Sequence, residues 1–233
     1  MQFRKLIFIY FLLLSFIGLS QHTEIGIIGG TSYYLGEINP SKQVINKVNP
    51  ALGVFYRKNL SKRYALRFGA NYAKVSATDD ITATEISNFR QLSFSSTILE
   101  GYGILEFHFL PYQIGNYTTY NYTPYVFIGA AVFRSSPTVE NNGGYYTESQ
   151  GSIIAPSMPF GVGLKFDIAG NVGMSLEWGM RKTWTDGIDG LSESYQSGYQ
   201  LSNTQNKDWY SIVGITLNYK ILTQSDHCPG VIN

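Results

Sequence analysis

Two glutamates stand in an otherwise apolar segment of this chain. Glu100 and Glu106 lie in TILEGYGILEFHFLPY, residues 97–112, and His108 follows them. Paired carboxylates can act as an acid and a base or relay protons, and hydrolases or acyltransferases add a histidine near a serine. The segment therefore allows either a membrane enzyme or a structural role for the glutamates.

Other signals of chemistry are weak. The histidines His22 and His227 stand apart from His108, and Cys228 is the only cysteine. These residues have none of the close spacings of a metal site, and the Gly-x-Gly pairs lack the helix that follows a phosphate loop. A single histidine on a strand is more often a packing residue. We therefore predict no enzyme, with no catalytic, cofactor-binding or metal-binding residues and no small-molecule substrate.

The composition and the N-terminus indicate an exported protein. The 233 residues carry 17 lysines and arginines against 16 aspartates and glutamates, a near-neutral balance that argues against a nucleic-acid partner. Arg4 and Lys5 precede an apolar run from Leu6 to Leu19. This run is shorter than the ~20 residues of a spanning helix and is typical of a secretory signal peptide cleaved after Ser20. The predicted division is a signal peptide (1–20), a β-barrel (21–220) and a C-terminal tail (221–233).

After the signal peptide, apolar residues alternate with small or polar residues in eight segments. For example, Leu52, Val54 and Tyr56 alternate with Gly53 and Arg57. Such strands are typical of outer-membrane β-barrels. The sequence predicts an all-β fold, an eight-stranded antiparallel transmembrane β-barrel in the outer membrane with both termini in the periplasm. The segments lie near 25–33, 52–57, 66–72, 99–109, 124–133, 161–168, 172–183 and 209–219.

The connections between these segments alternate in length. Long polar connections are predicted at 36–49, 77–91, 134–157 and 186–207, whereas most of the others are tight turns. This alternation is expected when the long loops of a barrel face the outside and the short turns face the periplasm. The segment 124–133 is apolar on both faces, so the pattern leaves its inward face open.

The barrel interior offers an explanation for the two glutamates. An eight-stranded barrel is filled by side chains, and a buried charge without a partner is strongly destabilising. Glu100 and Glu106 share one face of their strand, and further charged residues have inward parity. We predict a lattice of buried ion pairs, with a catalytic or proton-relaying carboxylate site as the alternative. The predicted members are Glu100, Glu106, Glu177, Asp167, Arg57, Arg67, Lys165 and Arg181.

Six segments carry a resemblance to a known family. They are EIGIIGGTSYYLGEINP (24–40), ILEGYGILEFHF (98–109), TPYVFIGAAVFRSSP (123–137), EWGMRKTWTDGIDGLS (177–192), DWYSIVGITLNYK (208–220) and the CP pair (228–229). In this order they resemble the PorG family, small outer-membrane β-barrels of the type IX secretion system of Bacteroidota. The resemblance implies a non-enzymatic role in protein secretion and, in some members, gliding motility. It also implies attachment of a periplasmic ring, built from the lipoprotein PorK and its partner PorN, to the outer membrane.

The partner surface is expected at the periplasmic end. Cys228 has no second cysteine in the chain, so it is either a free thiol or one half of an intermolecular disulfide. Under the resemblance, Cys228 and Pro229 form a candidate bridge to the ring lipoprotein, and a turn with Tyr112, Tyr117 and Tyr120 is a second candidate contact surface. Outer-membrane lipid is the other expected partner. Two further functions stay open: a stand-alone surface or adhesion barrel, and a small outer-membrane enzyme.

Overall fold

The computed structural model describes residues 22–35, 49–78, 92–115, 120–141, 147–149, 151–185 and 209–221. The predicted signal peptide lies outside these residues, and so does the predicted tail except for residue 221. No helix in the described ranges is long and apolar enough to cross a membrane.

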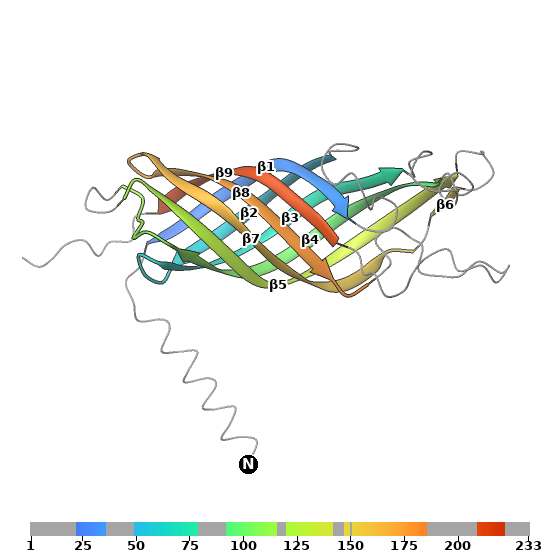
Figure 1. Ribbon diagram of the computed structural model, residues 1–233, viewed down its shortest axis with the longest axis horizontal. Coiled ribbons are helices and arrows are strands. Elements are labelled where there is room, and N and C mark those ends of the chain that lie inside the picture. The colour runs from blue at the N-terminus through green and yellow to red at the C-terminus, as the bar shows by residue number, and fades with distance from the viewer. Residues whose placement is uncertain are drawn as a thin grey trace, which may run out of the picture.

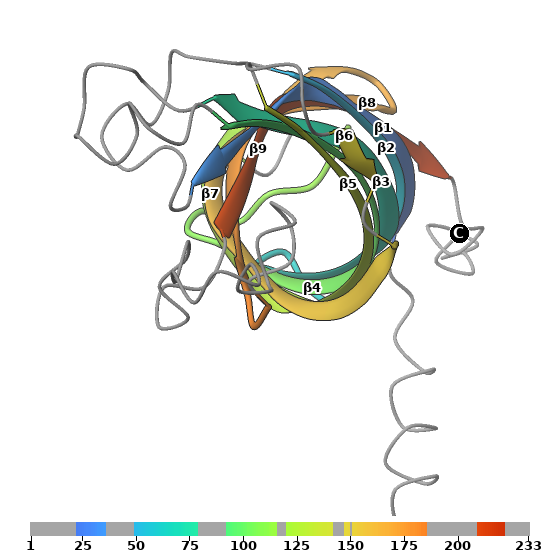
Figure 2. The same cartoon turned by 90° about the vertical axis from the view of Figure 1, so that its right-hand side faces the viewer.

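Eight long strands close into one barrel (Figure 1 and Figure 2). Neighbouring strands are antiparallel, and β4 pairs with both β3 and β5, which closes the ring. A short strand, β6, pairs with the end of β5. The predicted fold class is therefore confirmed. The strands of the described chain are β1 (Thr23–Leu35), β2 (Asn49–Asn59), β3 (Tyr64–Thr78), β4 (Leu92–His108), β5 (Tyr122–Asn141), β6 (Thr147–Ser149), β7 (Ile153–Ala169), β8 (Val172–Thr183) and β9 (Trp209–Ile221).

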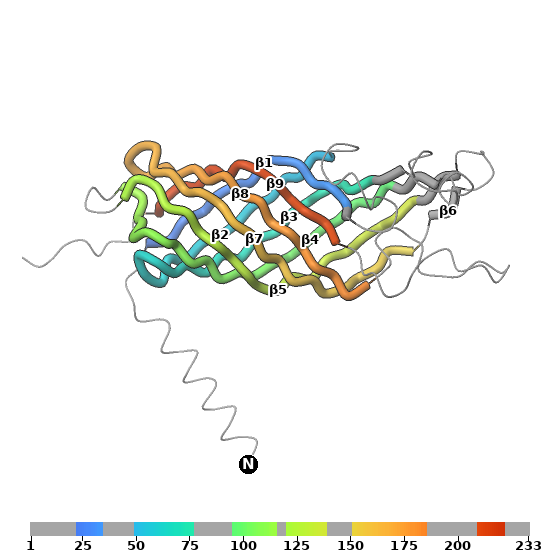
Figure 3. Tube along the Cα trace, viewed as in Figure 1, coloured from blue at the N-terminus to red at the C-terminus, as the bar shows by residue number. Residues whose placement is uncertain are grey.

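The strands are tilted relative to the long axis of the barrel (Figure 3). Following direct partners once around the ring from Thr23 leads back to β1 at Tyr33, ten residues further along. This stagger and the number of strands together set the width of a barrel, and eight strands leave an interior that side chains can fill.

Side chains alternate between the outer and inner faces of the wall. On β2, Leu52, Val54 and Tyr56 are exposed, whereas Phe55 and Arg57 are buried. The outward side chains of the other wall strands are also largely apolar. An apolar outer band of this kind is what a membrane-spanning barrel presents to lipid.

The structure determines which side of residues 124–133 faces inward, which the pattern left open. Tyr125, Phe127 and Phe133 are buried in the interior, whereas Ile128 and Val132 face outward. Both faces are apolar because aromatic side chains fill the interior at this strand. Hydrophobicity alone cannot separate lipid-facing from interior positions there.

The two ends of the barrel differ in their connections. At one end, which we call the short-turn end, residues 60–63 join β2 to β3, and Gly170 and Asn171 join β7 to β8. Gly170 has a φ of 52°, in the left-handed region that favours glycine. The first and last barrel residues, Thr23 and Ile221, pair with each other at this same end. The opposite end is called the long-loop end.

Two strands run well beyond their expected limits. β5 continues to Asn141 and β7 begins at Ile153, so the prediction of a long connection at 134–157 is wrong for most of that range. Pairing continues because a ladder requires only main-chain hydrogen bonds, and outward residues such as Arg134 and Ser136 suit water rather than lipid. The paired ends of β4 and β5, near Leu92 and Asn141, therefore project past the apolar band at the long-loop end.

Candidate functional site

Glu106 is the centre of an ion-pair network inside the barrel. Its carboxylate lies 3.0 Å from Nε of Arg57, 3.0 Å from Nε of Arg67 and 2.5 Å from Nζ of Lys165. All four side chains are buried. Because a buried charge is tolerated only when it is paired, these contacts account for a glutamate in an otherwise apolar segment.

Both arginines also contact a second carboxylate. An Nη of Arg57 lies 2.7 Å from Glu24, and an Nη of Arg67 lies 2.7 Å from Glu177. The hydroxyl of Tyr125 donates a further hydrogen bond of 2.7 Å to Glu177. The guanidinium group suits such bridging because it presents five donors in fixed directions. One connected network therefore joins β1, β2, β3, β4, β5, β7 and β8.

Aromatic rings surround the two arginines. The guanidinium carbon of Arg57 lies 4.9 Å from the ring centroid of Phe55. That of Arg67 lies 5.3 Å, 5.8 Å and 5.5 Å from the centroids of Phe55, Tyr102 and Phe127. The faces of aromatic rings attract cations at these distances. The rings thus stabilise the buried charges while they fill the interior.

A second polar group surrounds Glu100. Asn71 donates a hydrogen bond of 2.8 Å to its carboxylate, and the Tyr210 hydroxyl donates another. Nε of Arg181 lies 3.4 Å from the same carboxylate. Glu100 therefore has two hydrogen-bond donors and one cation, and it is fully enclosed.

Two of these contacts cross the full width of the barrel. In the ring of eight strands, β3 stands opposite β8, and β4 stands opposite β9. The ion pair from Arg67 to Glu177 joins the first two strands, and the hydrogen bond from Tyr210 to Glu100 joins the other two. The interior is therefore bound together across its diameter as well as between neighbouring strands.

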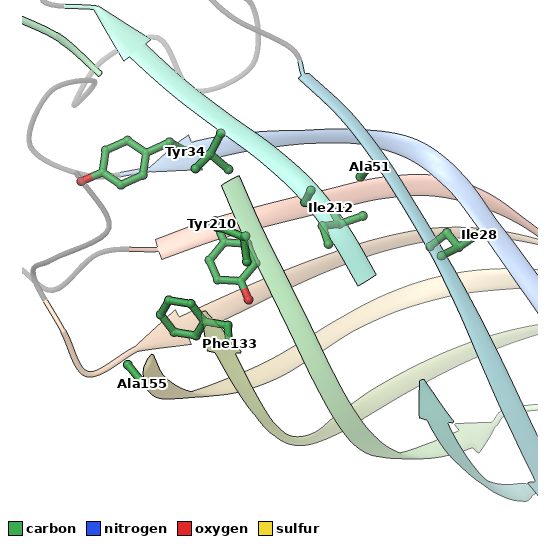
Figure 4. Close-up of a cluster of buried hydrophobic side chains, with 10 residues drawn as sticks. Ile28, Tyr34, Ala51, Phe133, Ala155, Tyr210 and Ile212 are labelled. Carbon is green, nitrogen blue, oxygen red and sulfur yellow. The ribbon is translucent and has the colours of Figure 1, made fainter. Parts of the chain in front are cut away.

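A hydrophobic cluster fills the interior toward the long-loop end (Figure 4). Its side chains come from seven of the eight wall strands. The rings of Phe133 and Tyr210 pack edge to face, with their centroids 5.8 Å apart. Beyond the polar groups, apolar packing therefore closes this side. The members are Ile28, Tyr34, Ala51, Ala73, Val75, Ile98, Phe133, Ala155, Tyr210 and Ile212.

His108 lies at the edge of the ion-pair network. Its Nε2 is 2.7 Å from Nζ of Lys165 and 3.5 Å from the Glu106 carboxylate. The rings of Tyr112 and Tyr125 pack edge to face against it. These contacts agree with a packing role, because neighbouring side chains enclose the His108 ring. No group of three or more metal-ligating side chains occurs among the described residues.

Residues 109–115, which we call the mouth segment, fold across the short-turn end of the barrel. The Tyr112 amide donates to the carbonyl of Lys62 at 3.0 Å. The Gly115 amide donates to the carboxylate of Asp167 at 2.8 Å. Gly115 has a φ of 68°, and a Cβ there would meet the carbonyl of Gly170. A glycine is therefore required where the segment passes the β7–β8 turn.

Ile114 anchors the mouth segment in the interior. Only 1% of its surface is exposed, and its side chain lies close against Gly173. Its carbonyl accepts a hydrogen bond of 3.1 Å from Nζ of Lys220. The mouth segment therefore fills the short-turn end as the hydrophobic cluster fills the other side.

Ile114→Asp should release the mouth segment, because an unpaired carboxylate destabilises the closed position of the segment. A cost above ~1.4 kcal/mol raises the population of the open mouth at least about tenfold. A cysteine placed at Ser175, which is buried in the wall, reports on this opening when Cys228 is replaced by serine. We expect a bulky thiol reagent to label Ser175→Cys about tenfold faster in the Ile114→Asp protein. Tyr120→Asp, at an exposed site of the same end, is the control. Equal labelling rates in all three proteins would show that the segment does not close the mouth.

The structure brings together most of the predicted lattice but not all of it. Asp167 stays outside the network, and its carboxylate accepts a hydrogen bond from the mouth segment. The β7–β8 pairing shifts its register between Asp167 and Ala169. Including it in the lattice is therefore wrong. Glu24 belongs to the network but was missed, although its parity with Gly26 places it inside. The predicted members that are buried in the interior are Glu100, Glu106, Glu177, Arg57, Arg67, Lys165 and Arg181.

The predicted partner residues have different positions. Tyr112 is buried in the mouth with 4% of its surface exposed, so its expected place on a contact surface is not compatible with this structure. Tyr120 is 54% exposed and remains accessible. Tyr117, Cys228 and Pro229 lie outside the described residues.

A closed eight-stranded wall, apolar outside and charged inside, defines the class of this protein as a transmembrane β-barrel of the outer-membrane type. Residues 3–230 match the family described as "Domain of unknown function (DUF6089)". The chain belongs to this family. No curated protein matches the sequence.

Several solved structures are similar to this chain. Ail, the attachment invasion locus protein of Yersinia pestis, is 10% identical, with a TM-score of 0.48, covering 87% of this chain and 100% of its own. A major outer membrane protein from Thermus thermophilus is 13% identical, with a TM-score of 0.47, covering 85% and 99%. The outer membrane protein OprG from Pseudomonas aeruginosa is 10% identical, with a TM-score of 0.42, covering 85% and 97%.

Proposed function

We propose that this protein is a non-enzymatic outer-membrane component of the type IX secretion machinery. In this role it attaches a periplasmic ring, formed by a PorK-like lipoprotein and a PorN-like protein, to the outer membrane. The observation that carries the proposal is the filled interior: ion pairs, a hydrophobic cluster and the mouth segment occupy the described lumen. A filled barrel suits an anchor better than a pore, and the PorG-like segments indicate what is anchored.

The proposed orientation places the short-turn end in the periplasm, as in other outer-membrane barrels. β9 ends at Ile221 on this end, and Cys228 and Pro229 follow it in the sequence. The periplasm permits disulfides, which makes a Cys228 bridge to the ring lipoprotein chemically reasonable. Tyr120 and Tyr122 are exposed at the same end and extend the proposed contact surface.

Deletion of the gene is expected to abolish export of type IX secretion substrates, and gliding where the cell glides. Restoring the wild-type gene should restore export. Non-reducing gels of the outer membrane should then show a heavier species that is absent after reduction and absent in Cys228→Ser. Normal export in the deletion strain would reject the function, whereas normal export with Cys228→Ser would reject only the bridge.

A stand-alone surface or adhesion barrel is the second candidate function. The projection of the paired ends of β4 and β5 beyond the apolar band favours it, since this part of the wall would stand outside the cell. Shortening these two strand ends should abolish function if adhesion is the role and leave secretion unchanged if anchoring is the role. An enzymatic role would instead require turnover of a lipid or protein by the purified barrel.

A further inference from the structure

The outer face of β3, β4 and β5 changes from apolar to basic within one row of residues. Tyr72, Leu99 and Arg134 are direct partners across these strands, and the row below holds Ala70, Gly101 and Val132. The next row toward the long-loop end holds Lys74, Thr97 and Ser136. On β3 and β4, Lys74 and Thr97 therefore lie one row beyond Tyr72 and Leu99, and on β5, Arg134 and Ser136 lie beyond Val132. On the neighbouring β7, the partner of Arg134 is the exposed apolar Ile154.

Charges of both signs point into the barrel, whereas the outward charges with described side chains are cations. The wall glutamates with described side chains, Glu24, Glu100, Glu106 and Glu177, all point inward. Asp167 lies at the mouth. Among the strand residues whose side chains the structure describes, the outward charged ones are Lys58, Lys74, Arg134 and Lys182. The outer surface is therefore complementary to anions where it leaves the apolar band.

Lys74 and Arg134 form the densest part of this basic surface. They flank β4 on either side and lie on a diagonal: Lys74 pairs with Thr97, whereas Arg134 pairs with Leu99, two residues away on β4. Neighbouring strands are about 4.8 Å apart and a strand rises about 3.3 Å per residue, so the two backbone positions lie roughly 12 Å from each other. Long flexible side chains at this spacing can meet on one phosphate, and the hydroxyls of Thr97 and Ser136 can donate to its remaining oxygens or to a sugar. Both cations are exposed.

Small residues lie below these cations on the same outer face. Ala70, Gly101 and Ala130 are exposed, and a Cβ at Gly101 would meet no atom within 4 Å. An acyl chain can therefore lie directly against the wall beneath the cations. A headgroup contact above an acyl contact is the arrangement that a membrane lipid requires.

We propose that Lys74, Arg134, Thr97 and Ser136 bind the phosphorylated sugar headgroup of a glycolipid in the membrane leaflet at the long-loop end. The proposal rests on the orientation given above, in which this leaflet is the outer one. The phosphate accepts hydrogen bonds from Lys74 and Arg134, and the sugar and phosphate oxygens accept from the two hydroxyls. This phosphate-binding site is separate from the periplasmic surface proposed to hold the ring.

The test uses the full mature chain in detergent with added diphosphoryl lipid A. Native mass spectrometry should detect one bound lipid, and the thermal midpoint should rise with lipid concentration. In the double variant Lys74→Gln/Arg134→Gln, affinity should fall about tenfold or more, because two charge-assisted contacts are lost. Lys58→Gln removes an outward lysine at the opposite end and should leave affinity unchanged.

Each remaining arm of the experiment can overturn the proposal. Equal affinity for fully dephosphorylated lipid A would remove the phosphate contact. Equal affinity for phosphatidylglycerol would indicate general attraction to anionic lipid rather than glycolipid binding. A comparable rise of the midpoint with inorganic phosphate alone would indicate a free-anion site. An equal loss of lipid affinity in Lys58→Gln would show that net charge, and not the position of the cations, governs binding.

Discussion

Glu106→Ala is expected to destabilise the barrel by about 3–5 kcal/mol, the cost of breaking a buried ion pair by removing one partner. The loss should be large because one carboxylate contacts Arg57, Arg67 and Lys165. Lys165 depends most on it, since its other close polar neighbour is His108. Heat-modified gel migration and urea unfolding in micelles or bilayers measure the change.

Two further variants separate charge from packing at this position. Glu106→Gln keeps the size of the side chain and an acceptor oxygen but removes the charge, so its loss should be intermediate. Asp167→Ala removes a carboxylate at the mouth, outside the network, and should have a smaller effect. Replacing Glu106 by leucine together with loss of its cationic partner should be nearly neutral. Equal unfolding midpoints for wild type and Glu106→Ala would refute the central role of this carboxylate.

Arg67→Ala is expected to cost a similar amount, about 3–5 kcal/mol. The substitution removes contacts to Glu106 and Glu177 at once and leaves both carboxylates buried. It also removes the cation from the rings of Tyr102 and Phe127, whereas Phe55 keeps its contact with Arg57. Urea unfolding of the purified barrel gives the free energy.

The controls for Arg67 test geometry and position. Arg67→Lys should recover only part of the loss, because an ammonium group lacks the planar fork that reaches two carboxylates. Arg134→Ala removes an exposed arginine and should change the free energy of unfolding by less than about 0.5 kcal/mol. Full stability in Arg67→Lys would mean that charge alone, without bidentate geometry, holds the network.

The sequence was sufficient to predict the wall. Alternation on β2 and β8 placed Leu52 outside and Glu177 inside, because lipid and interior impose opposite demands on successive residues. The alternation was insufficient on β5, because Tyr125 and Phe127 fill the interior with side chains as apolar as those that face lipid. A period-two pattern carries no information when both faces are apolar.

The partners within the lattice could not be predicted from the sequence. Lys165 meets Glu106 from a distance of 59 residues along the chain, and this meeting depends on the stagger of the whole ring. The mouth segment could not be predicted for the same reason, since Ile114 is buried by strand ends that are distant in sequence. Parity shows that a charge points inward, but not which charge it meets.

The contacts across the barrel diameter have a mechanical consequence. A hollow cylinder under a sideways pull flattens, whereas struts from Arg67 to Glu177 and from Tyr210 to Glu100 oppose flattening along two diameters. Force applied at the short-turn end would then be transmitted to the whole ring of strands rather than absorbed by local deformation. Such stiffness suits the role of membrane anchor proposed above.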